Sequence, residues 1–402
     1  MAISRKGLER LRAAALHGGT VGNIASNRRS VHAAYRYPAR FSPVFAGAAI
    51  EAFSSPGDTV VDPFCGGGTT GIEATLRARH VFSSDLSPLA VFLARAKGTE
   101  YRLKDYSAVE EWADDCLNIS YLSLTRDSHL VEDGRMSLGA LEGPEYRYVL
   151  AALSGWERQL RDLTFGQDLA RLALLRCGQR TLDLRREIPT LDALRDTLLA
   201  TVNHTISASL IFSKELREVW ASQKSRRSYK CRELPVHKID SRQGLGRRKA
   251  QLAVFSPPYP GIHVLYPRWQ LLGRKESAAP FWLAGVSGDT NETTYTMGRR
   301  GVERTDEFVA MYSNGLRSLA TVLDPGAFMV QMIGFKDPSH QLPQVLRSIR
   351  HAGFQEVRFK SLATASDGRL WRTVPSQRWY NAVREGPTPG SKEVVLVHRL
   401  DG

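Results

Sequence analysis

Cysteine is scarce in this 402-residue sequence. Its four cysteines form no Cys-x-x-Cys pair, and no histidines accompany them at the spacing of metal ligands. This distribution argues against a zinc module and against a disulfide-stapled fold. The four positions are Cys65, Cys116, Cys177 and Cys231.

Long hydrophobic runs are also missing. No apolar run approaches the ~18 residues that a transmembrane helix needs, and the first residues carry charges throughout, unlike a secretory signal peptide. Hydrophobic residues make up 42% and charged residues 24% of the chain, which is typical of a globular protein. We therefore expect a cytoplasmic protein.

Acidic residues are outnumbered, with 41 Asp and Glu against 55 Lys and Arg, a formal net charge of +14. Such a surface attracts polyanions, because binding releases their counterions. The excess concentrates between Phe212 and Lys249, where twelve basic residues face four acids. This stretch is either a solvated basic face or a surface that follows DNA phosphates. Its candidate DNA-binding residues are Arg226, Arg227, Lys230, Arg247 and Arg248.

Short apolar runs alternate with helix-period segments over residues 58–98. "DTVV" and "HVFSSD" are predicted strands, and "TTGIEATLRAR" and "SPLAVFLARAK" are predicted helices. A βαβα succession of this kind indicates an α/β fold with a doubly wound, mostly parallel sheet.

A glycine-rich turn joins the first of these strands to its helix. Gly66, Gly68 and Gly71 satisfy G-x-G-x-x-G, and Asp85, nineteen residues beyond Gly66, is placed to bind a ribose diol. The glycines alone are compatible with a dinucleotide, with S-adenosylmethionine, or with a turn that only packs helix on strand. Asp62 at the end of the first strand would repel a pyrophosphate and attract the cationic aminoacyl end of S-adenosylmethionine.

Another apolar run, Leu252–Phe255, ends abruptly at Ser256-Pro257-Pro258-Tyr259. Prolines fix their own φ and donate no backbone hydrogen bond, so the strand cannot continue. The result is either an ordinary turn or a rigid corner whose oxygen atoms accept hydrogen bonds from a ligand.

Both motifs resemble those of one family. "DPFCGGGTT" resembles the cofactor loop, and "SPPY" the catalytic motif, of the exocyclic-amino DNA methyltransferases that make N4-methylcytosine or N6-methyladenine. "YRYPARFSP" is similar to the segment that closes over the methionine end of the cofactor. "VHKIDSRQGL" is similar to the strand whose acid, here Asp240, lies near the adenine.

The resemblance implies a class I methyltransferase fold, S-adenosylmethionine as cofactor and no metal. Ser256 Oγ and the Pro257 carbonyl would accept the protons of the target amine, Pro258 would stiffen the corner, and Tyr259 would stack on a base flipped out of duplex DNA. The implied cofactor-binding residues are Tyr37, Arg40, Phe41, Asp62, Pro63, Phe64, Gly66, Gly68, Thr69, Thr70, Asp85, Leu86 and Asp240.

The cofactor half precedes the catalytic half, as in enzymes of this family whose target-recognition region lies between them. We predict a discontinuous catalytic domain, residues 1–100 and 236–402, interrupted by a mainly helical DNA-binding module at 101–235. Arg372 and Arg378, among aromatic residues, are further candidate DNA contacts or belong to a loop packed on its own rings. Four residues after SPPY either line the base pocket or pack in the core: His263, Tyr266, Arg268 and Trp269.

The predicted activity is methylation of duplex DNA, with cytosine N4 ahead of adenine N6 because the motif begins with serine. An RNA guanine N2-methyltransferase and a DNA-binding protein on an inactive methyltransferase fold are the alternatives. An NAD-dependent oxidoreductase would explain the glycines but neither SPPY nor the charge. A restriction-modification or defence partner and the oligomeric state stay open.

Overall fold

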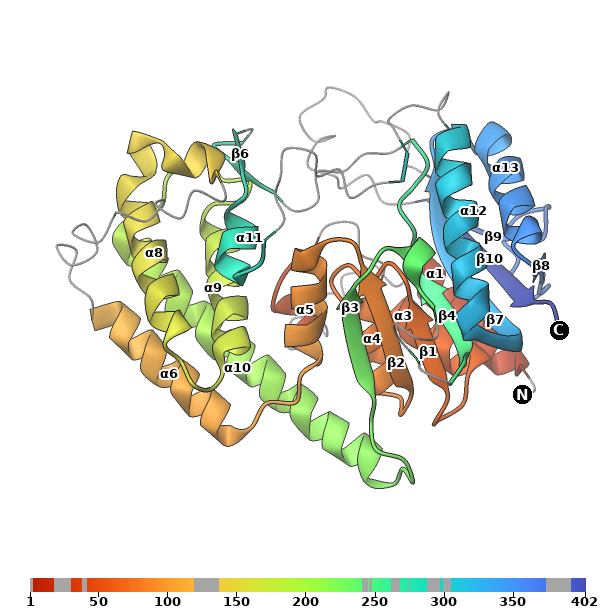
Figure 1. The fold of residues 1–402 in the computed structure, drawn as a ribbon, viewed down its shortest axis with the longest axis horizontal. Coiled ribbons are helices and arrows are strands. Elements are labelled where there is room, and N and C mark those ends of the chain that lie inside the picture. Colours follow the sequence, from red (N-terminus) through yellow and green to blue (C-terminus); the bar gives the residue numbers. More distant parts are fainter. Residues whose placement is uncertain are drawn as a thin grey trace.

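The computed structural model describes residues 3–17, 30–37, 42–118, 137–240, 245, 248–261, 268–273, 275–287, 297–298, 305–373 and 392–402. Its centre is an eight-stranded sheet flanked by helices, with a group of helices to one side (Figure 1).

The sheet has the strand order β3-β2-β1-β4-β7-β10-β8, and β9 pairs with β10 outside this path. Neighbours from β3 to β7 run parallel, whereas β10 is antiparallel to β7, β8 and β9. This is a class I methyltransferase arrangement, and it confirms the predicted doubly wound, mostly parallel sheet. The strands are β1 (Thr59–Asp62), β2 (His80–Asp85), β3 (Tyr229–Glu233), β4 (Ala250–Phe255), β7 (Leu323–Phe335), β8 (Phe354–Glu356), β9 (Leu370–Thr373) and β10 (Lys392–Leu400).

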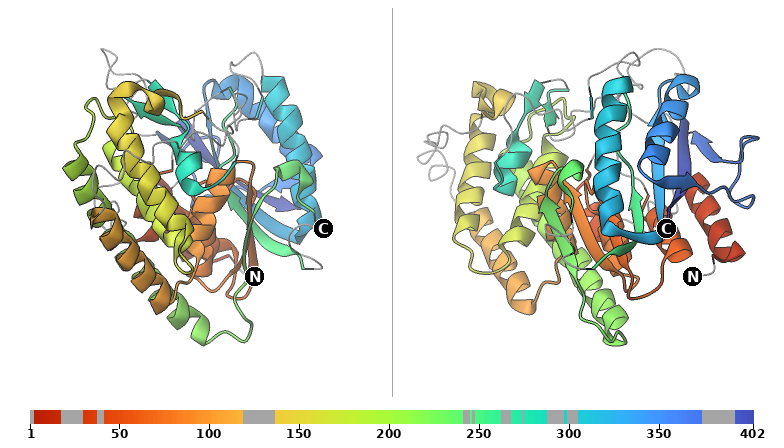
Figure 2. Two further views of the ribbon diagram at one scale, coloured as in Figure 1. Left: turned by 60° about the vertical axis from the view of Figure 1, so that its left-hand side comes forward. Right: turned by 45° about the vertical axis from the view of Figure 1, so that its right-hand side comes forward.

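Both faces of the central strands β1 and β4 are buried, which explains their apolar runs, whereas the edge strand β3 is largely exposed. Successive residues point to opposite faces, so Val60 and Val61 belong to different cores. Helices α1 (Arg5–His17) and α3 (Pro43–Phe53) cover the Val60 face. Helices α12 (Thr305–Val322) and α13 (Pro338–His351) cover the Val61 face (Figures 1 and 2).

The helices predicted within residues 58–98 are confirmed as α4 (Thr69–Thr75) and α5 (Pro88–Gly98). Helix α5 begins where Ser87 Oγ accepts a hydrogen bond from the Ala90 N–H, with proline at the first helical position. Each helix follows the carboxyl end of a strand, so its N-terminus lies at the same edge of the sheet.

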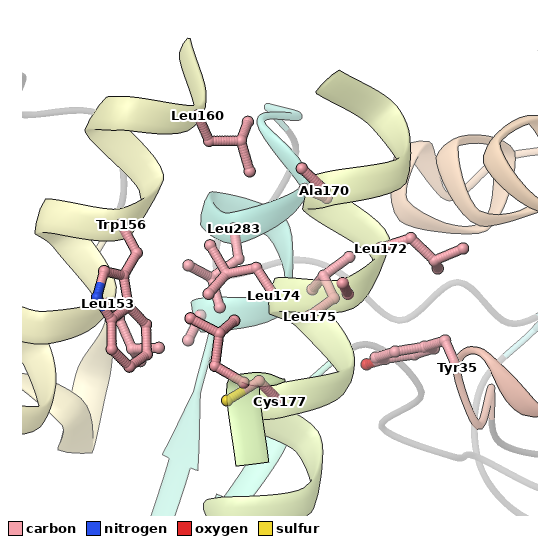
Figure 3. Packing of buried hydrophobic residues seen from close by; sticks show 14 of the residues in the cluster. Tyr35, Leu153, Trp156, Leu160, Ala170, Leu172, Leu174, Leu175, Cys177 and Leu283 are labelled. Atoms are coloured by element: carbon pink, nitrogen blue, oxygen red, sulfur yellow. The ribbon is translucent and has the colours of Figure 1, made fainter. Parts of the chain in front are cut away.

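Four further helices stand beside the sheet and pack on one another: α6 (Leu103–Asn118), α8 (Arg147–Arg161), α9 (Gln167–Thr181) and α10 (Leu191–Ala221). Short 3-10 turns, Gly139–Glu142 and Pro144–Tyr146, lead into α8. Figure 3 shows Trp156 of α8 and Leu174 and Cys177 of α9 in their shared core. Neither the 31-residue α10 nor any other helix in the described part of the chain is long and apolar enough to cross a membrane.

Residues beyond the SPPY motif complete this helical core. The hairpin of β5 (Trp269–Leu271) and β6 (Lys275–Ser277) and the short helix α11 (Ala279–Ala284) contribute buried side chains to it, including Leu271 and Leu283. The segment after the SPPY motif therefore joins the two parts of the molecule.

The chain segment that leads from α10 back to the sheet differs from the predicted structure in two ways. Strand β3 lies within residues 101–235 yet pairs with β2, so the sheet resumes before residue 235. The strand predicted at 236–245 is wrong, because Val236–Lys238 form a 3-10 helix. Pro235 explains this change, since it cannot donate a hydrogen bond and ends the pairing just after the Leu234 N–H reaches the Asp85 carbonyl at 2.9 Å.

Candidate active site at the carboxyl edge of the sheet

The cofactor-loop and SPPY motifs lie side by side, although nearly two hundred residues separate them. Strand β1 pairs in parallel with β4, with Val61 opposite Ala253, so Asp62 and Ser256 follow neighbouring strand ends. The Thr70 hydroxyl donates a hydrogen bond of 3.1 Å to the Val254 carbonyl. The first turn of α4 is thus fastened to the strand that carries SPPY.

The glycine loop turns sharply into α4. Gly66 and Gly68 have φ of +47° and +82°, conformations that favour glycine. A Cβ at Gly68 would lie 2.8 Å from the Ala94 Cα, so α5 also approaches too closely for a side chain. The Gly66 N–H donates to Asp85 Oδ2 at 2.9 Å and thus points at a carboxylate.

Asp62 and Asp85 end adjacent strands, the first buried and the second half-buried, and the described residues give neither an ion pair. Asp62 is only 2% exposed, and its Oδ1 accepts the Phe64 N–H at 3.0 Å. Burial raises the Asp62 pKa to about 7, and the neighbouring Asp85 carboxylate adds to the increase. Burial also raises the Asp85 pKa, against hydrogen bonds from the Ser87, Gly66 and Leu86 N–H groups. Among the described residues, neither carboxylate has a cation that lowers its pKa, so this edge suits a cationic ligand.

Tyr37, in the predicted closing segment, lies against the glycine loop. A Cβ at Gly67 would lie 2.9 Å from the Tyr37 Cβ. The nearby Lys97 Nζ donates to the Tyr35 carbonyl at 3.1 Å and to the Gly67 carbonyl at 3.2 Å. Lys97 is only 3% exposed. The sequence does not reveal this role, because a lysine near the end of a helix normally indicates a surface position.

The closing segment also binds the helical core. The amide of Gln179 on α9 pairs with both the N–H and the carbonyl of Arg36, at 3.0 and 2.8 Å. The Trp269 Nε1–H donates to the Tyr35 hydroxyl at 3.2 Å, and Figure 3 shows Tyr35 directed toward α9. Trp269 is therefore a core residue, one of the two roles considered for it. Its neighbour Arg268 forms an ion pair with Glu276 at 3.5 Å.

In the SPPY corner, the hydroxyl protons of Ser256 and Tyr259 are already engaged in hydrogen bonds within the protein. Ser256 Oγ lies 3.0 Å from the Met332 carbonyl, which can only accept, and 3.4 Å from the Tyr259 hydroxyl. Tyr259 in turn donates to Glu393 Oε1 at 2.7 Å. A hydroxyl has one proton and two lone pairs, so Ser256 retains acceptor capacity.

Arg372, predicted to contact DNA, instead supports this corner. Its Nε and Nη2 lie 2.7 and 2.6 Å from Glu393 Oε2, and its Nη1 donates to the Ala15 carbonyl at 3.1 Å. The buried Glu393 carboxylate requires a positive partner, and Arg372 on the adjacent strand β9 supplies it.

The other predicted DNA-binding residues that the structure describes, Arg226, Arg227, Lys230 and Arg248, lie at the opposite edge of the sheet. Arg226 and Arg227 precede β3, and Arg248 precedes β4, so they flank the amino ends of the parallel strands. Arg227 donates to the Gly98 carbonyl at 3.1 Å, and burial lowers its pKa, which indicates a structural role. Arg248 and Lys230 line a cavity of about 330 Å³ together with Thr59, His80, Val81, Ser228 and Leu245.

The other predicted cofactor-binding residues differ in how buried they are. Pro63 is buried, the Phe64 ring lies 5.5 Å from that of Phe255, and Leu86 is 51% exposed beside Asp85. Asp240 is exposed after the 3-10 turn. The predictions at Arg40, Phe41, Arg247, His263, Tyr266 and Arg378 lie outside the described residues.

Two cysteines meet beside the cofactor loop, which their spacing in the sequence does not predict. The Cys65 and Cys231 sulfurs, on the loop and on β3, lie 3.7 Å apart, and both are free thiols. The hydrogen bond between them, with burial, raises the pKa of the Cys65 thiol. Cys65 is therefore held as a neutral thiol between the two acids.

One protein-family model matches the part of the chain that contains the glycine loop. The family model described as "DNA methylase" matches residues 20–96, which contain the closing segment, the glycine loop and Asp85. Residues 20–96 match the DNA methylase family. The resemblance predicted from the cofactor loop is thus confirmed, and the matched range ends before SPPY. No curated protein matches the chain.

Several solved structures are similar at low identity. TrmN from Thermus thermophilus is 12% identical, with a TM-score of 0.31 and an alignment that covers 93% of this chain and 51% of that one. The chain thus spans about half the length of TrmN. The rRNA methyltransferase aviRa from Streptomyces viridochromogenes is 12% identical, with a TM-score of 0.35 and coverage of 93% and 92%.

Gly68→Ala should destabilise the protein more than Gly57→Ala. Both glycines have strongly positive φ, +82° and +90°, but a Cβ at Gly57 would meet nothing within 4 Å. Gly57→Ala should cost only backbone strain, about 1–2 kcal/mol, and Gly68→Ala about 1–3 kcal/mol more because it presses on α5. Urea denaturation measures both, and equal losses would contradict the close approach of Ala94.

Asp62→Asn should change how the free energy of unfolding depends on pH. The folded protein keeps the Asp62 proton up to about pH 7, whereas the unfolded chain releases it near pH 4. Asp62 therefore stabilises the fold at low pH, and this contribution disappears as the pH rises through 7. Relative to wild type, the asparagine variant should gain up to about 4 kcal/mol between pH 4 and 8.

Urea denaturation across that range checks the effect, with the exposed Asp114→Asn as a control for the same change of charge. A difference between Asp62→Asn and wild type that stays constant with pH would mean that Asp62 is ionised normally.

Proposed function

We propose that the protein transfers a methyl group from S-adenosylmethionine to the exocyclic amine of a base flipped out of duplex DNA, with cytosine N4 as the first choice. The observation that carries this proposal is the adjacency of two motifs. An acidic cofactor loop and a proline-stiffened corner follow neighbouring parallel strands, so a bound cofactor and a target amine would meet at one edge.

The loop fits S-adenosylmethionine better than a dinucleotide. The Gly66 N–H, which a dinucleotide site would direct at a pyrophosphate, donates to the Asp85 carboxylate. Asp62 and Asp85 would bind the aminoacyl cation and the ribose hydroxyls, while Tyr37 closes over the loop. When bound, S-adenosylmethionine supplies an activated methyl group with a good leaving group, so the protein contributes mainly alignment.

The corner is suited to accept the protons of a planar amine. Ser256 already donates its proton to the Met332 carbonyl, so only its lone pairs are left for the substrate. With the Pro257 carbonyl as a second acceptor, the amine nitrogen is drawn toward a tetrahedral geometry that exposes its lone pair. Pro257 and Pro258 keep these acceptors fixed, and the Tyr259 ring provides a stacking surface for the base.

We assign target recognition to the helices within residues 101–235. They are tied to the cofactor loop through Gln179, Arg36 and Tyr35, and they share their core with the segment that follows SPPY. DNA held by these helices would therefore lie beside the corner where its base is methylated.

Ser256→Ala should lower single-turnover methylation of DNA by tritiated S-adenosylmethionine on the order of 10²-fold, the effect of losing one preorganised polar partner. Calorimetric binding of S-adenosylmethionine should be unchanged, because Ser256 lies outside the cofactor loop. Ser318→Ala is the matched control, since it removes another serine hydroxyl bonded to a carbonyl, that of His237, far along α12.

Analysis of the methylated base separates N4-methylcytosine from N6-methyladenine. Methylation of RNA alone would overturn the DNA proposal, and an unchanged rate for Ser256→Ala would make SPPY an ordinary turn.

Arg226 and Arg248 lie at the edge of the sheet opposite the SPPY corner, the basic edge, so phosphates that they contact would lie away from the target base. Arg226→Ala combined with Arg248→Ala should therefore weaken DNA binding at every sequence. The slope of log K against log salt should fall by about 0.9 for each phosphate that the protein no longer neutralises. We leave Arg227 unchanged because its guanidinium supports the Gly98 carbonyl.

The control is Arg347→Ala with Arg350→Ala, which removes the same charge from the exposed side of α13. Fluorescence anisotropy over a salt series measures both pairs. Equal slopes for the two variants would identify the basic edge as a solvated surface.

A further inference from the structure

The hydroxyl of Tyr259 is bound by a buried carboxylate from the other end of the chain. Glu393 on β10 is 6% exposed, and its Oε1 accepts the Tyr259 proton at 2.7 Å. Nothing in the SPPY motif itself indicates this partner, which lies 134 residues away.

The two carboxylate oxygens of Glu393 accept hydrogen bonds from different residues. Oε2 accepts from both Nε and Nη2 of Arg372, at 2.7 and 2.6 Å. Arg372 is held in turn by the Ala15 carbonyl at 3.1 Å. Because Oε2 is used by the guanidinium, Oε1 is directed to Tyr259, and the hydroxyl proton has a single fixed direction.

The ring of Tyr259 is fixed as well. A Cβ at Gly334 on β7 would lie 2.6 Å from the Tyr259 Cε2, so the ring lies directly on the strand backbone. Gly334 is the residue opposite Glu393 in the β7–β10 pairing. The same pair of strands therefore supports the ring and binds its hydroxyl, while the tyrosine stays partly exposed.

We propose that Glu393, held by Arg372, is a positioning residue that keeps the Tyr259 proton away from Ser256. This inference rests on the proposed methyl transfer. With its proton on Glu393, Tyr259 cannot donate to Ser256 Oγ, 3.4 Å away. The lone pairs of Ser256 are then kept for the target amine, and the Tyr259 ring is kept in one plane for the base.

Glu393→Gln should reverse this arrangement without changing the size of the side chain. Arg372 needs an acceptor and takes the amide oxygen, which turns the amide NH₂ toward Tyr259. The hydroxyl then accepts, and its proton turns to the remaining acceptor, Ser256 Oγ. We expect single-turnover methylation about tenfold slower with little change in DNA or cofactor affinity, in the range of couplings between contacting residues.

Tyr259→Phe combined with Glu393→Gln provides the decisive comparison. Phenylalanine has no hydroxyl group that could donate a hydrogen bond to Ser256. Glu393→Gln should therefore have no further effect on the methylation rate in that background. A tenfold loss in both backgrounds would show that Glu393 only stabilises the fold and would overturn the proposal.

Glu356→Gln is the matched control for a lost ion pair. Glu356 is a carboxylate bound by Arg369 at 2.7 Å in the same part of the sheet, and it has no described contact with Tyr259. Thermal unfolding should show that both glutamine variants lose stability. Only Glu393→Gln should slow methylation, and an equal slowing by Glu356→Gln would also overturn the proposal.

An NMR measurement separates this inference from the proposed function. In protein labelled with [¹³Cζ]tyrosine, Glu393→Gln should shift the resonance that Tyr259→Phe removes and leave that of the remote Tyr106 in place. If the wild type methylates no nucleic acid but the resonance shifts, the methyl-transfer proposal fails and the hydrogen bond stands. If the resonance does not move, the positioning role is wrong whatever the activity.

Discussion

The parallel pairing of β1 with β4 is the constraint on which the candidate site depends. Parallel neighbours place their carboxyl ends at one edge, so Asp62 and Ser256 come together although the helical region separates them in sequence. Thr70 then fastens the start of α4 to the Val254 carbonyl, which prevents the cofactor loop from moving independently of the corner. A shift of this register would separate the two motifs without unfolding either one.

The other buried carboxylates among the described residues have cationic partners. Glu73 lies between His32 and Arg77, Glu157 binds Arg161 and Arg171, and Glu393 binds Arg372. Asp62 and Asp85 differ because backbone N–H groups are the main partners that the described residues give them. Asp62 and Asp85 have no such cation among the described residues, and they lie at the edge where a cationic ligand is expected. This contrast separates the two acids from the structural ion pairs.

The fold was accessible from the sequence where the signals are local. The strands at 59–62, 80–85 and 250–255 are apolar runs bounded by turns, and the glycines and prolines after them indicate the loop and the corner. The partners of these motifs were not accessible, since Lys97, Gln179 and Glu393 meet the site from remote elements. Arg372 and Arg227 were predicted to contact DNA because the sequence shows that a charged residue is present but not where its side chain points. The structure turns both guanidinium groups inward.

The support of Tyr259 from β10 has a consequence for how the protein is made. Ribosomes synthesise about 5–20 residues per second, so the corner at 256–259 exists for several seconds before Glu393 is available. Pairing over such a separation forms slowly, because the closure of a long loop precedes any gain from the contact. The half of the sheet that carries Asp62 and Asp85 can assemble first, around β1 and β2. The SPPY corner is therefore among the last parts of the molecule to mature, and a nascent chain would form its glycine loop before Tyr259 is fixed.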